Sequence, residues 1–137
     1  MKKFLFTLTA ILILGTLYAQ PLKKGNLIGT HVVTYELLPG VTFEQFEKFY
    51  LEEFIPEYEK IRTGWELTLL KGRRGIHKDK LLVVIKMESE KVRAKYFNKD
   101  GSTTDFYKET GEKVKPLYTK LKTYITYTTE YTNWEVL

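Results

Sequence analysis

Histidine and cysteine, which often carry acid–base and nucleophilic chemistry in proteins, are scarce in this sequence. Cysteine is absent, and there are only two histidines, His31 and His77. His31 stands four residues before Tyr35 in the segment HVVTY, and residues that far apart in a strand point to the same face of the sheet. A half-buried imidazole beside a phenol can take up and return a proton or contact a haem, so His31 and Tyr35 are the candidate catalytic residues. The alternative is a structural histidine near a strand end, bonded to backbone or water.

A basic segment, KGRRGIHKDK at residues 71–80, contains the second histidine, and five of its ten residues are Lys or Arg. Arg74 and His77 can bind an anionic ligand there, because the guanidinium fork matches a carboxylate or a phosphate. The alternatives are a solvated hairpin tip whose glycines serve the turn, and an Arg74 that returns to a sheet carboxylate such as Glu36 or Glu66.

Aromatic residues make up 15% of the chain. Tyrosine joins a large apolar ring to a polar hydroxyl, and a pocket lined in this way suits a flat or sugar-like ligand. We expect Trp65, Tyr96 and Tyr127 to form the walls of such a pocket, with Arg93 at its edge. The alternatives are that the aromatic residues form the core and a subunit interface, and that Arg93 is a surface ion-pair partner.

Motifs for metal binding or covalent catalysis are missing from the sequence. It contains no HExxH motif, no paired-carboxylate signature and no nucleophile elbow. The two histidines have no ligand spacing, and the lack of cysteine removes thiolate ligands and disulfides. We therefore expect no metal and no cofactor.

The N-terminal segment MKKFLFTLTAILILGTLYA has the order of a secretory signal peptide. Two lysines precede an apolar run, and small residues follow it up to Ala19. The run is shorter than the roughly 20 apolar residues that span a bilayer, although an uncleaved anchor is the alternative. We expect cleavage near Ala19 and a periplasmic or secreted bacterial protein that has no membrane attachment after cleavage.

Residues 20–137 have the length of one domain. The signal segment holds two of the 22 basic residues and none of the 17 acidic ones, so the remaining chain has 20 against 17, a net charge of +3. Lysines alternate with glutamates and do not form one basic stripe. This mild and dispersed charge argues against a nucleic-acid partner.

The hydrophobic periodicity predicts the element order β-α-β-β-α-α-β, which is the ferredoxin-like βαββαβ pattern with the second helix divided. Thr42 and Gln45 predict a capping box, Pro56 a kink or restart of the first helix, and Ser89 a cap for the second. The helix that Asp105 opens is expected to be interrupted around Gly111 and Pro116. The predicted strands cover residues 30–38, 65–72, 80–87 and 124–131, and the predicted helices cover residues 42–63, 89–97 and 105–121.

Both faces of the predicted sheet carry apolar residues. In the third strand, Leu81 and Val83 alternate with Leu82 and Val84, and the first strand also has valines on each face. A face left to water would be more uniformly polar. We therefore expect the face without helices to be covered, most simply by a second copy of the same sheet in a homodimer.

The segments YELLPGVTFEQFEKFYLEEFIPEYEK, GWELTLLKG and LLVVIKMESEKVRAKYF together resemble the dimeric α+β barrel superfamily, which includes antibiotic-biosynthesis-type monooxygenases and EthD-like and NIPSNAP-like proteins. The resemblance implies two sheets paired in a barrel, with small molecules bound between the helices and the sheet of each subunit.

The chain lacks the second-helix histidine that the resemblance would require for a haem-degrading member. We expect an exported domain that binds a small apolar or aromatic molecule, with cofactor-free oxygenase or isomerase chemistry as its possible activity. The alternative is a non-catalytic binding or interaction protein whose homodimer is the functional unit.

Overall fold

The computed structural model describes residues 22–137, and the signal peptide predicted for residues 1–19 lies outside them. The elements are β1 (Leu27–Leu37), α1 (Phe43–Phe49), the π-helical turn η1 (Tyr50–Phe54), α2 (Ile55–Ile61), β2 (Trp65–Lys71), β3 (Leu81–Met87), α3 (Glu90–Tyr96), α4 (Asp105–Leu121) and β4 (Ile125–Glu135). With α1, η1 and α2 taken as one helical rod, the predicted element order is confirmed.

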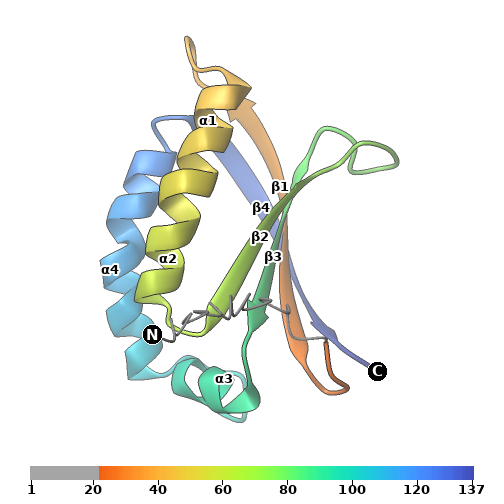
Figure 1. Cartoon of the computed structure of the whole chain (residues 1–137), viewed down its shortest axis with the longest axis vertical. Helices are drawn as coiled ribbons and strands as arrows, with labels where there is room; N and C mark the ends of the chain where they lie inside the picture. Colours follow the sequence, from red (N-terminus) through yellow and green to blue (C-terminus); the bar gives the residue numbers. More distant parts are fainter. Residues whose placement is uncertain (1–21) are drawn as a thin grey trace, which may run out of the picture.

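The four strands form one antiparallel sheet in the order β2-β3-β1-β4. The long helices α1, α2 and α4 cover one face, and α3 lies across one end of the molecule (Figure 1). This α+β architecture confirms the four-stranded antiparallel sheet and is consistent with a ferredoxin-like fold. Strand β4 extends to Glu135, four residues beyond the predicted end, because its entire length pairs with β1.

The first helical rod begins with the predicted capping box. The Thr42 hydroxyl accepts from the Gln45 amide at 3.2 Å, and the Gln45 side chain accepts from the Thr42 amide at 2.8 Å. Directly before Pro56 the rod widens into η1, where the Ile55 amide donates to the carbonyl of Tyr50. Proline has no N–H to continue the α-helical ladder, so the irregularity predicted at Pro56 takes the form of a π-helical turn.

The second helical segment is divided as predicted, into α3 and α4. Ser89 caps α3 by accepting from the Val92 amide at 3.2 Å. The interruption expected around Gly111 and Pro116 is wrong, because α4 runs unbroken through both residues. Pro116 is exposed, and the Thr119 hydroxyl donates to the carbonyl of Lys115 at 3.2 Å, so local hydrogen bonding continues past the proline.

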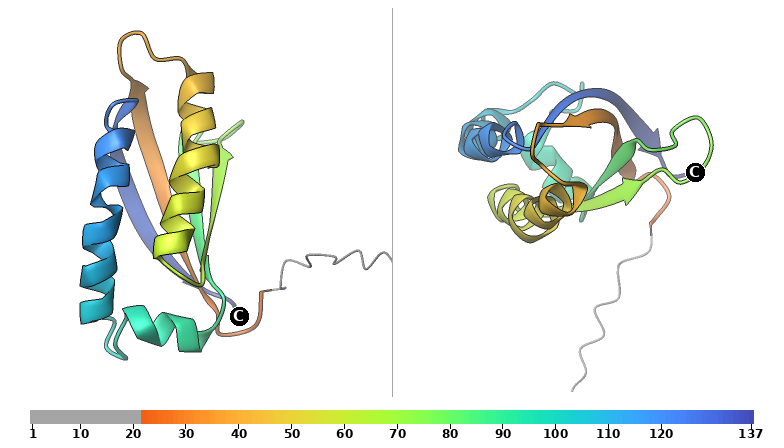
Figure 2. Two further views of the ribbon diagram at one scale, coloured as in Figure 1. Left: turned by 60° about the vertical axis from the view of Figure 1, so that its left-hand side comes forward. Right: turned by 90° about the horizontal axis from the view of Figure 1, so that it is seen from above.

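The face of β1 that carries His31, Val33 and Tyr35 is the one that meets the helices. Val33 packs in the core with Leu81 and Val83 of β3, below the aromatic face of the helical rod. Phe46 and Phe54 from that rod are fully buried. Figure 2 shows the α1–α2 rod and α4 side by side in one layer on this face, with the sheet curving behind them.

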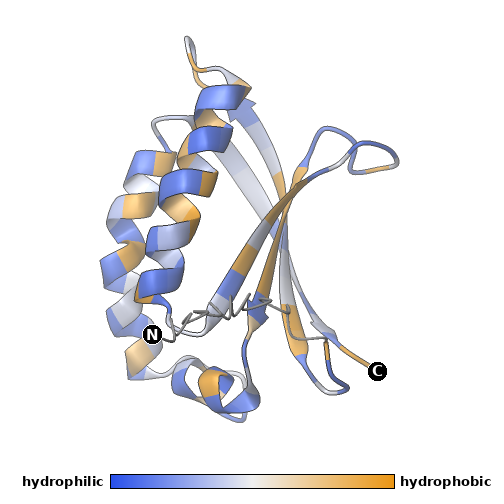
Figure 3. Ribbon diagram, viewed as in Figure 1, coloured by the Kyte–Doolittle hydropathy of each residue, from blue (hydrophilic) through white to orange (hydrophobic). Residues whose placement is uncertain are grey.

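No helix of residues 22–137 covers the opposite face of the sheet (Figures 1 and 2). An apolar row crosses three strands there, since Leu82 pairs with both Leu70 and Val32. Leu70 is exposed, while Val32 and Leu82 are half-buried. Trp134 is 56% exposed and donates from Nε1 to the Thr30 hydroxyl on the same face. Colouring by hydropathy shows apolar residues along β2 and β3 and a largely polar outer surface on the long helices (Figure 3).

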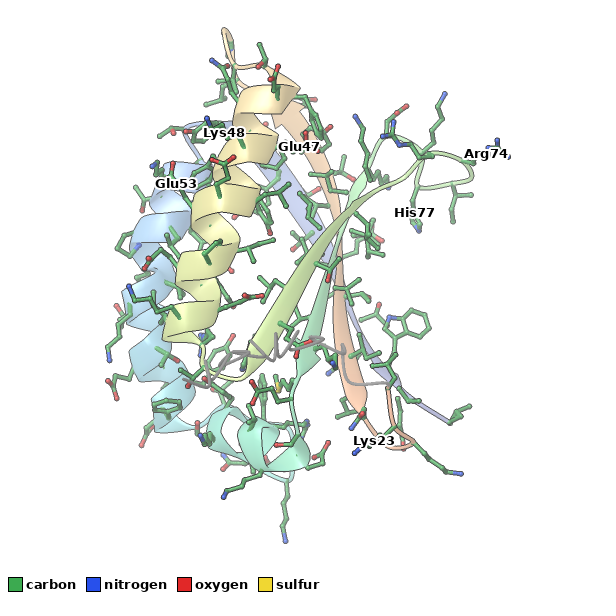
Figure 4. All side chains as sticks on the ribbon, viewed as in Figure 1. Lys23, Glu47, Lys48, Glu53, Arg74 and His77 are labelled. Carbon is green, nitrogen blue, oxygen red and sulfur yellow. The ribbon has the colours of Figure 1, made fainter. Side chains whose placement is uncertain are left out.

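The basic segment forms an exposed loop between β2 and β3, as predicted. Arg74 and His77 project from this loop at the far side of the sheet from the helices (Figure 4). Glu66 pairs with Lys86 at 3.0 Å, and no described carboxylate pairs with Arg74, so the predicted return of Arg74 to the sheet is wrong. Within residues 22–137 no helix is both long enough and apolar enough to cross a membrane.

Candidate functional site

A cavity of about 410 Å³ lies between the helices and the sheet. That volume falls within the roughly 300–1,000 Å³ range of small-molecule pockets. Its walls are mainly apolar and aromatic side chains, and every helix and strand contributes at least one residue. Tyr58 comes from α2, Arg93 comes from α3, and Phe97 directly follows α3. The cavity exists because the curved sheet diverges from the helices and the side chains between them do not fill the space.

Four tyrosine hydroxyls gather in the cavity wall, from Tyr50, Tyr58, Tyr118 and Tyr127. Burial raises the pKa of Tyr50 and of Tyr118 far above the usual value, and the charges of the other phenols would raise both further if they ionised. The rings of Tyr58 and Tyr118 meet edge to face, with 6.4 Å between their centroids, and burial raises the pKa of Tyr58 as well. These tyrosines are therefore neutral near pH 7, and they offer hydroxyl groups to a ligand.

Arg62, at the end of α2, supports the aromatic wall from behind. It is 2% exposed, and its Nη1 donates to the Tyr107 carbonyl at 2.9 Å and to the Thr110 hydroxyl at 2.5 Å. Its guanidinium carbon lies 4.0 Å from the ring centroid of Tyr107 and 5.4 Å from that of Trp65. Among the described residues no carboxylate pairs with it, so aromatic faces and neutral oxygens stabilise this buried cation.

The cavity opens beside the C-terminal half of β4, where the wall residues Thr129, Tyr131 and Asn133 are exposed. Tyr131 packs flat against β1 because residue 29 is glycine: a Cβ at Gly29 would lie 3.2 Å from the Tyr131 ring. The Tyr131 hydroxyl donates to Asn133 Oδ1 at 2.5 Å. Burial raises the pKa of Tyr131, and the hydrogen bond with Asn133 and the charge of Arg93 lower it. Arg93, on α3, is itself a half-buried residue of the cavity wall.

His31 lies on the cavity wall beside the mouth. Its ring centroid is 4.7 Å from that of Tyr131. Burial lowers the pKa of His31, because a charged imidazole is less well solvated there. The imidazole is therefore neutral near pH 7, and one of its ring nitrogens can accept a proton.

The structure brings four of the predicted site residues together on the cavity wall: His31, Trp65, Arg93 and Tyr127. Tyr35 is not among the wall residues, since its ring packs on Phe43 and Phe46 at 6.2 and 6.0 Å. His31 and Tyr35 share a face of β1, as predicted, but only His31 faces the cavity.

Three further predicted residues lie outside the cavity wall. Tyr96 is fully buried behind Trp65, with its hydroxyl donating to the Thr63 carbonyl at 3.0 Å. Arg74 and His77 are on the exposed loop between β2 and β3 (Figure 4). His31, the candidate base, thus lies at the cavity, whereas Arg74 and His77, the candidate anion-binding residues, lie on a separate exposed loop.

Sequence reasoning missed five tyrosines as site residues: Tyr50, Tyr58, Tyr107, Tyr118 and Tyr131. A signal was present on α4, because Tyr107 and Tyr118 are eleven residues apart, about three helical turns, and so point to one side of the helix. Tyr131 lies two strand positions after Thr129 and four after Tyr127, on the same face of β4. The sequence could not show that these faces leave a space between them.

Among residues 22–137 no group of three or more His, Asp or Glu side chains is placed to hold a metal ion. In comparisons with known proteins, no protein-family model, no curated protein and no solved structure matches the chain. The cavity and the residues around it therefore carry the functional argument.

Proposed function

We propose that this protein binds a small apolar or aromatic molecule in the cavity between its helices and its sheet. The observation that carries the proposal is the unfilled volume of about 410 Å³ within an aromatic wall. An unfilled apolar space costs stability, and a ligand that occupies it recovers the lost contacts.

The arrangement of polar groups supports binding of a specific ligand. The wall includes Tyr50, Tyr58, Tyr118 and Tyr127 among side chains that are mainly apolar. A few converging polar groups in an apolar pocket orient a ligand, and the apolar area provides the affinity. This is the site expected from the resemblance to dimeric α+β barrel proteins, and that resemblance stays a proposal.

The test uses N-phenyl-1-naphthylamine, a neutral aromatic probe whose fluorescence rises in apolar surroundings. We expect saturable binding to the purified protein, with one probe per chain. The chain has two tryptophans, so Trp65 alone remains in a Trp134→Phe variant. Binding of the probe should change the tryptophan fluorescence of that variant. In a Trp65→Phe variant, the emission of Trp134 on the opposite sheet face should not change.

Two matched substitutions on β3 locate the probe. Val83 lines the cavity, and its neighbour Val84 lies on the opposite face of the sheet. Val83→Phe should reduce the number of bound probes or their affinity, and Val84→Phe should not. Far-UV circular dichroism of both variants checks that the fold is retained. The absence of saturable binding, or equal loss in both variants, would contradict the proposed cavity function.

A second candidate function, cofactor-free proton transfer, rests on the placement of His31. No Asp or Glu is among the described wall residues, which leaves the neutral imidazole of His31 as the wall group suited to accept a proton near pH 7. A base of this kind can remove a proton from a carbon next to a carbonyl. Tyr35, its predicted partner, is outside the wall and is left out of this candidate.

The test of proton transfer is exchange of deuterium from solvent into the methyl group of 2-acetonaphthone, followed by mass spectrometry. The protein should accelerate exchange, and His31→Gln should remove the acceleration while leaving the binding of N-phenyl-1-naphthylamine in place. Exchange no faster than in buffer would exclude His31 as a base for this class of substrate. The protein would then remain a non-catalytic binding protein.

The partner we propose for the open sheet face is a second copy of the chain. The apolar row formed by Leu70, Leu82 and Val32 supports this, since it crosses the face that the helices leave uncovered. Two copies of one sheet can bury such a row against each other around a two-fold axis. This dimer is the unit that the resemblance to dimeric α+β barrels implies.

Native mass spectrometry tests the dimer. We expect a mass twice that of the monomer for the purified protein and a monomer mass for Leu82→Glu, which places a charge in the row. Thr126→Glu, at an exposed position of β4 away from the row, is the matched control and should stay dimeric. A monomer in the unsubstituted protein would contradict this interface.

A further inference from the structure

The cavity wall is almost free of charge. Among its residues, all within the described part of the chain, Arg93 alone carries a permanent charge, and none is an Asp or Glu. The wall residues Tyr50, Tyr58, Tyr118, Tyr127 and His31 are neutral near pH 7 for the reasons given above. A ligand in this cavity therefore meets one positive charge and no negative charge.

Arg93 has no internal counter-ion. Its guanidinium lies 5.7 Å from the ring centroid of Phe97, and no described carboxylate forms an ion pair with it. Several other cations of the helices do have such partners: Lys113 pairs with Glu109, and Lys108 pairs with Asp105. An unpaired guanidinium at the edge of an apolar cavity leaves its hydrogen-bond donors available to an anion.

The position of Arg93 is suited to a charged group that keeps part of its hydration. Arg93 is a half-buried wall residue on α3, and its charge acts on Tyr131 at the cavity mouth, while the apolar part of the wall includes Phe46 and Leu121. An amphiphilic molecule can place its charged end at the mouth and its apolar part inside. A charge held deep in the cavity would lose its solvation and would have no partner.

We propose that the ligand of this cavity is an organic monocarboxylate, with its carboxylate on the Arg93 guanidinium at the mouth and its apolar or aromatic part against the inner wall. The inference rests on the proposed binding function and adds the chemical class of the ligand. A carboxylate matches the planar guanidinium with two parallel hydrogen bonds, and a neutral ligand leaves Arg93 unpaired. A cationic ligand is repelled by Arg93, the one permanent charge among the described wall residues.

The experiment displaces N-phenyl-1-naphthylamine from the full chain with two competitors of nearly the same shape, naphthalene-2-carboxylate and naphthalene-2-carboxamide. The carboxylate should bind the unsubstituted protein about tenfold or more tightly than the amide, because hydrogen bonds to charged groups are stronger. Arg93→Gln should weaken the carboxylate about 10- to 100-fold and leave the amide and the neutral probe within about twofold. Lys91→Gln removes an exposed charge from the same helix and should change none of the three.

The outcomes separate the two proposals. If the neutral probe does not bind, the cavity function is wrong, and this inference fails with it. If the probe binds but the carboxylate is no tighter than the amide, the cavity function stands and the assignment of a monocarboxylate is overturned. Equal weakening of carboxylate and amide by Arg93→Gln would also overturn it, since Arg93 would then act as part of the wall and not through its charge.

Discussion

The guanidinium of Arg62 lies over the ring of Tyr107, with 4.0 Å between the guanidinium carbon and the ring centroid. The contact joins the end of α2 to the first turn of α4, and the same arginine donates to the Tyr107 carbonyl. Tyr107 in turn lines the cavity. A buried cation thus links the α1–α2 rod to α4, the two helical elements that form one wall of the site.

Replacement of Arg62 should destabilise the protein. Arg62→Ala removes two hydrogen bonds and the contacts with three aromatic rings, and we expect a loss of about 3 kcal/mol in the free energy of unfolding. Arg62→Met should cost less, because it keeps much of the buried volume and removes a charge that is costly to bury. Urea unfolding measures both, with Lys60→Ala at the exposed neighbouring position as control. A loss below about 1 kcal/mol for Arg62→Ala would contradict this role.

The tyrosine cluster should make the protein sensitive to alkali. Below about pH 10, Tyr50 and Tyr118 are protonated in both the folded and the unfolded state. Above that pH the unfolded state ionises first, because burial raises the pKa of both residues in the folded state, so stability falls as the pH rises. Urea unfolding between pH 8 and 11, roughly the range that brackets a free phenol, should show this loss.

The double variant Tyr50→Phe with Tyr118→Phe should lose less stability across the same alkaline range. Absorbance of tyrosinate provides an independent readout, since these two phenols should ionise together with unfolding in the unsubstituted protein. Ionisation of all ten tyrosines before unfolding would show that the cluster is open to solvent.

His31 should contribute to loss of stability in acid. Above its ordinary pKa of about 6.5 the imidazole is neutral in both states. Burial lowers the pKa of His31 in the folded state, so below that pH the unfolded state binds the proton first and stability falls. His31→Gln should reduce the fall in unfolding free energy between about pH 7 and pH 5. His77→Gln, on the exposed loop, is the matched control, and an equal effect of both substitutions would contradict the prediction.

The basic loop should not take part in binding at the cavity. Arg74 and His77 project from the far side of the sheet (Figure 4), and neither lines the cavity. Arg73→Ala combined with Arg74→Ala should therefore leave the affinity for N-phenyl-1-naphthylamine and for naphthalene-2-carboxylate unchanged within about twofold, less than the loss of one hydrogen bond. Abolished binding of the carboxylate would instead favour anion capture by this loop.

The sequence alone determined the features that depend only on residues close to one another along the chain. Thr42 with Gln45 and Ser89 predicted helix starts that the structure confirms, because a cap is satisfied within one turn. Alternation placed His31 and Tyr35 on one face of β1, and the hairpin loop followed from the short distance between two apolar runs. Pro116 was misread, because one exposed proline removes a single helical hydrogen bond and the packing of α4 on the core outweighs that cost.

The site was decided by tertiary structure. His31 and Tyr35 share a face, but the helical rod crosses the sheet so that Phe43 and Phe46 cover Tyr35 while His31 stays on the cavity wall. The edge-to-face contact of the Tyr58 and Tyr118 rings joins residues sixty positions apart on two helices. Local patterns specify which way each side chain points from its own element. The distance between elements depends on how all the side chains between them pack, and that distance leaves the cavity open.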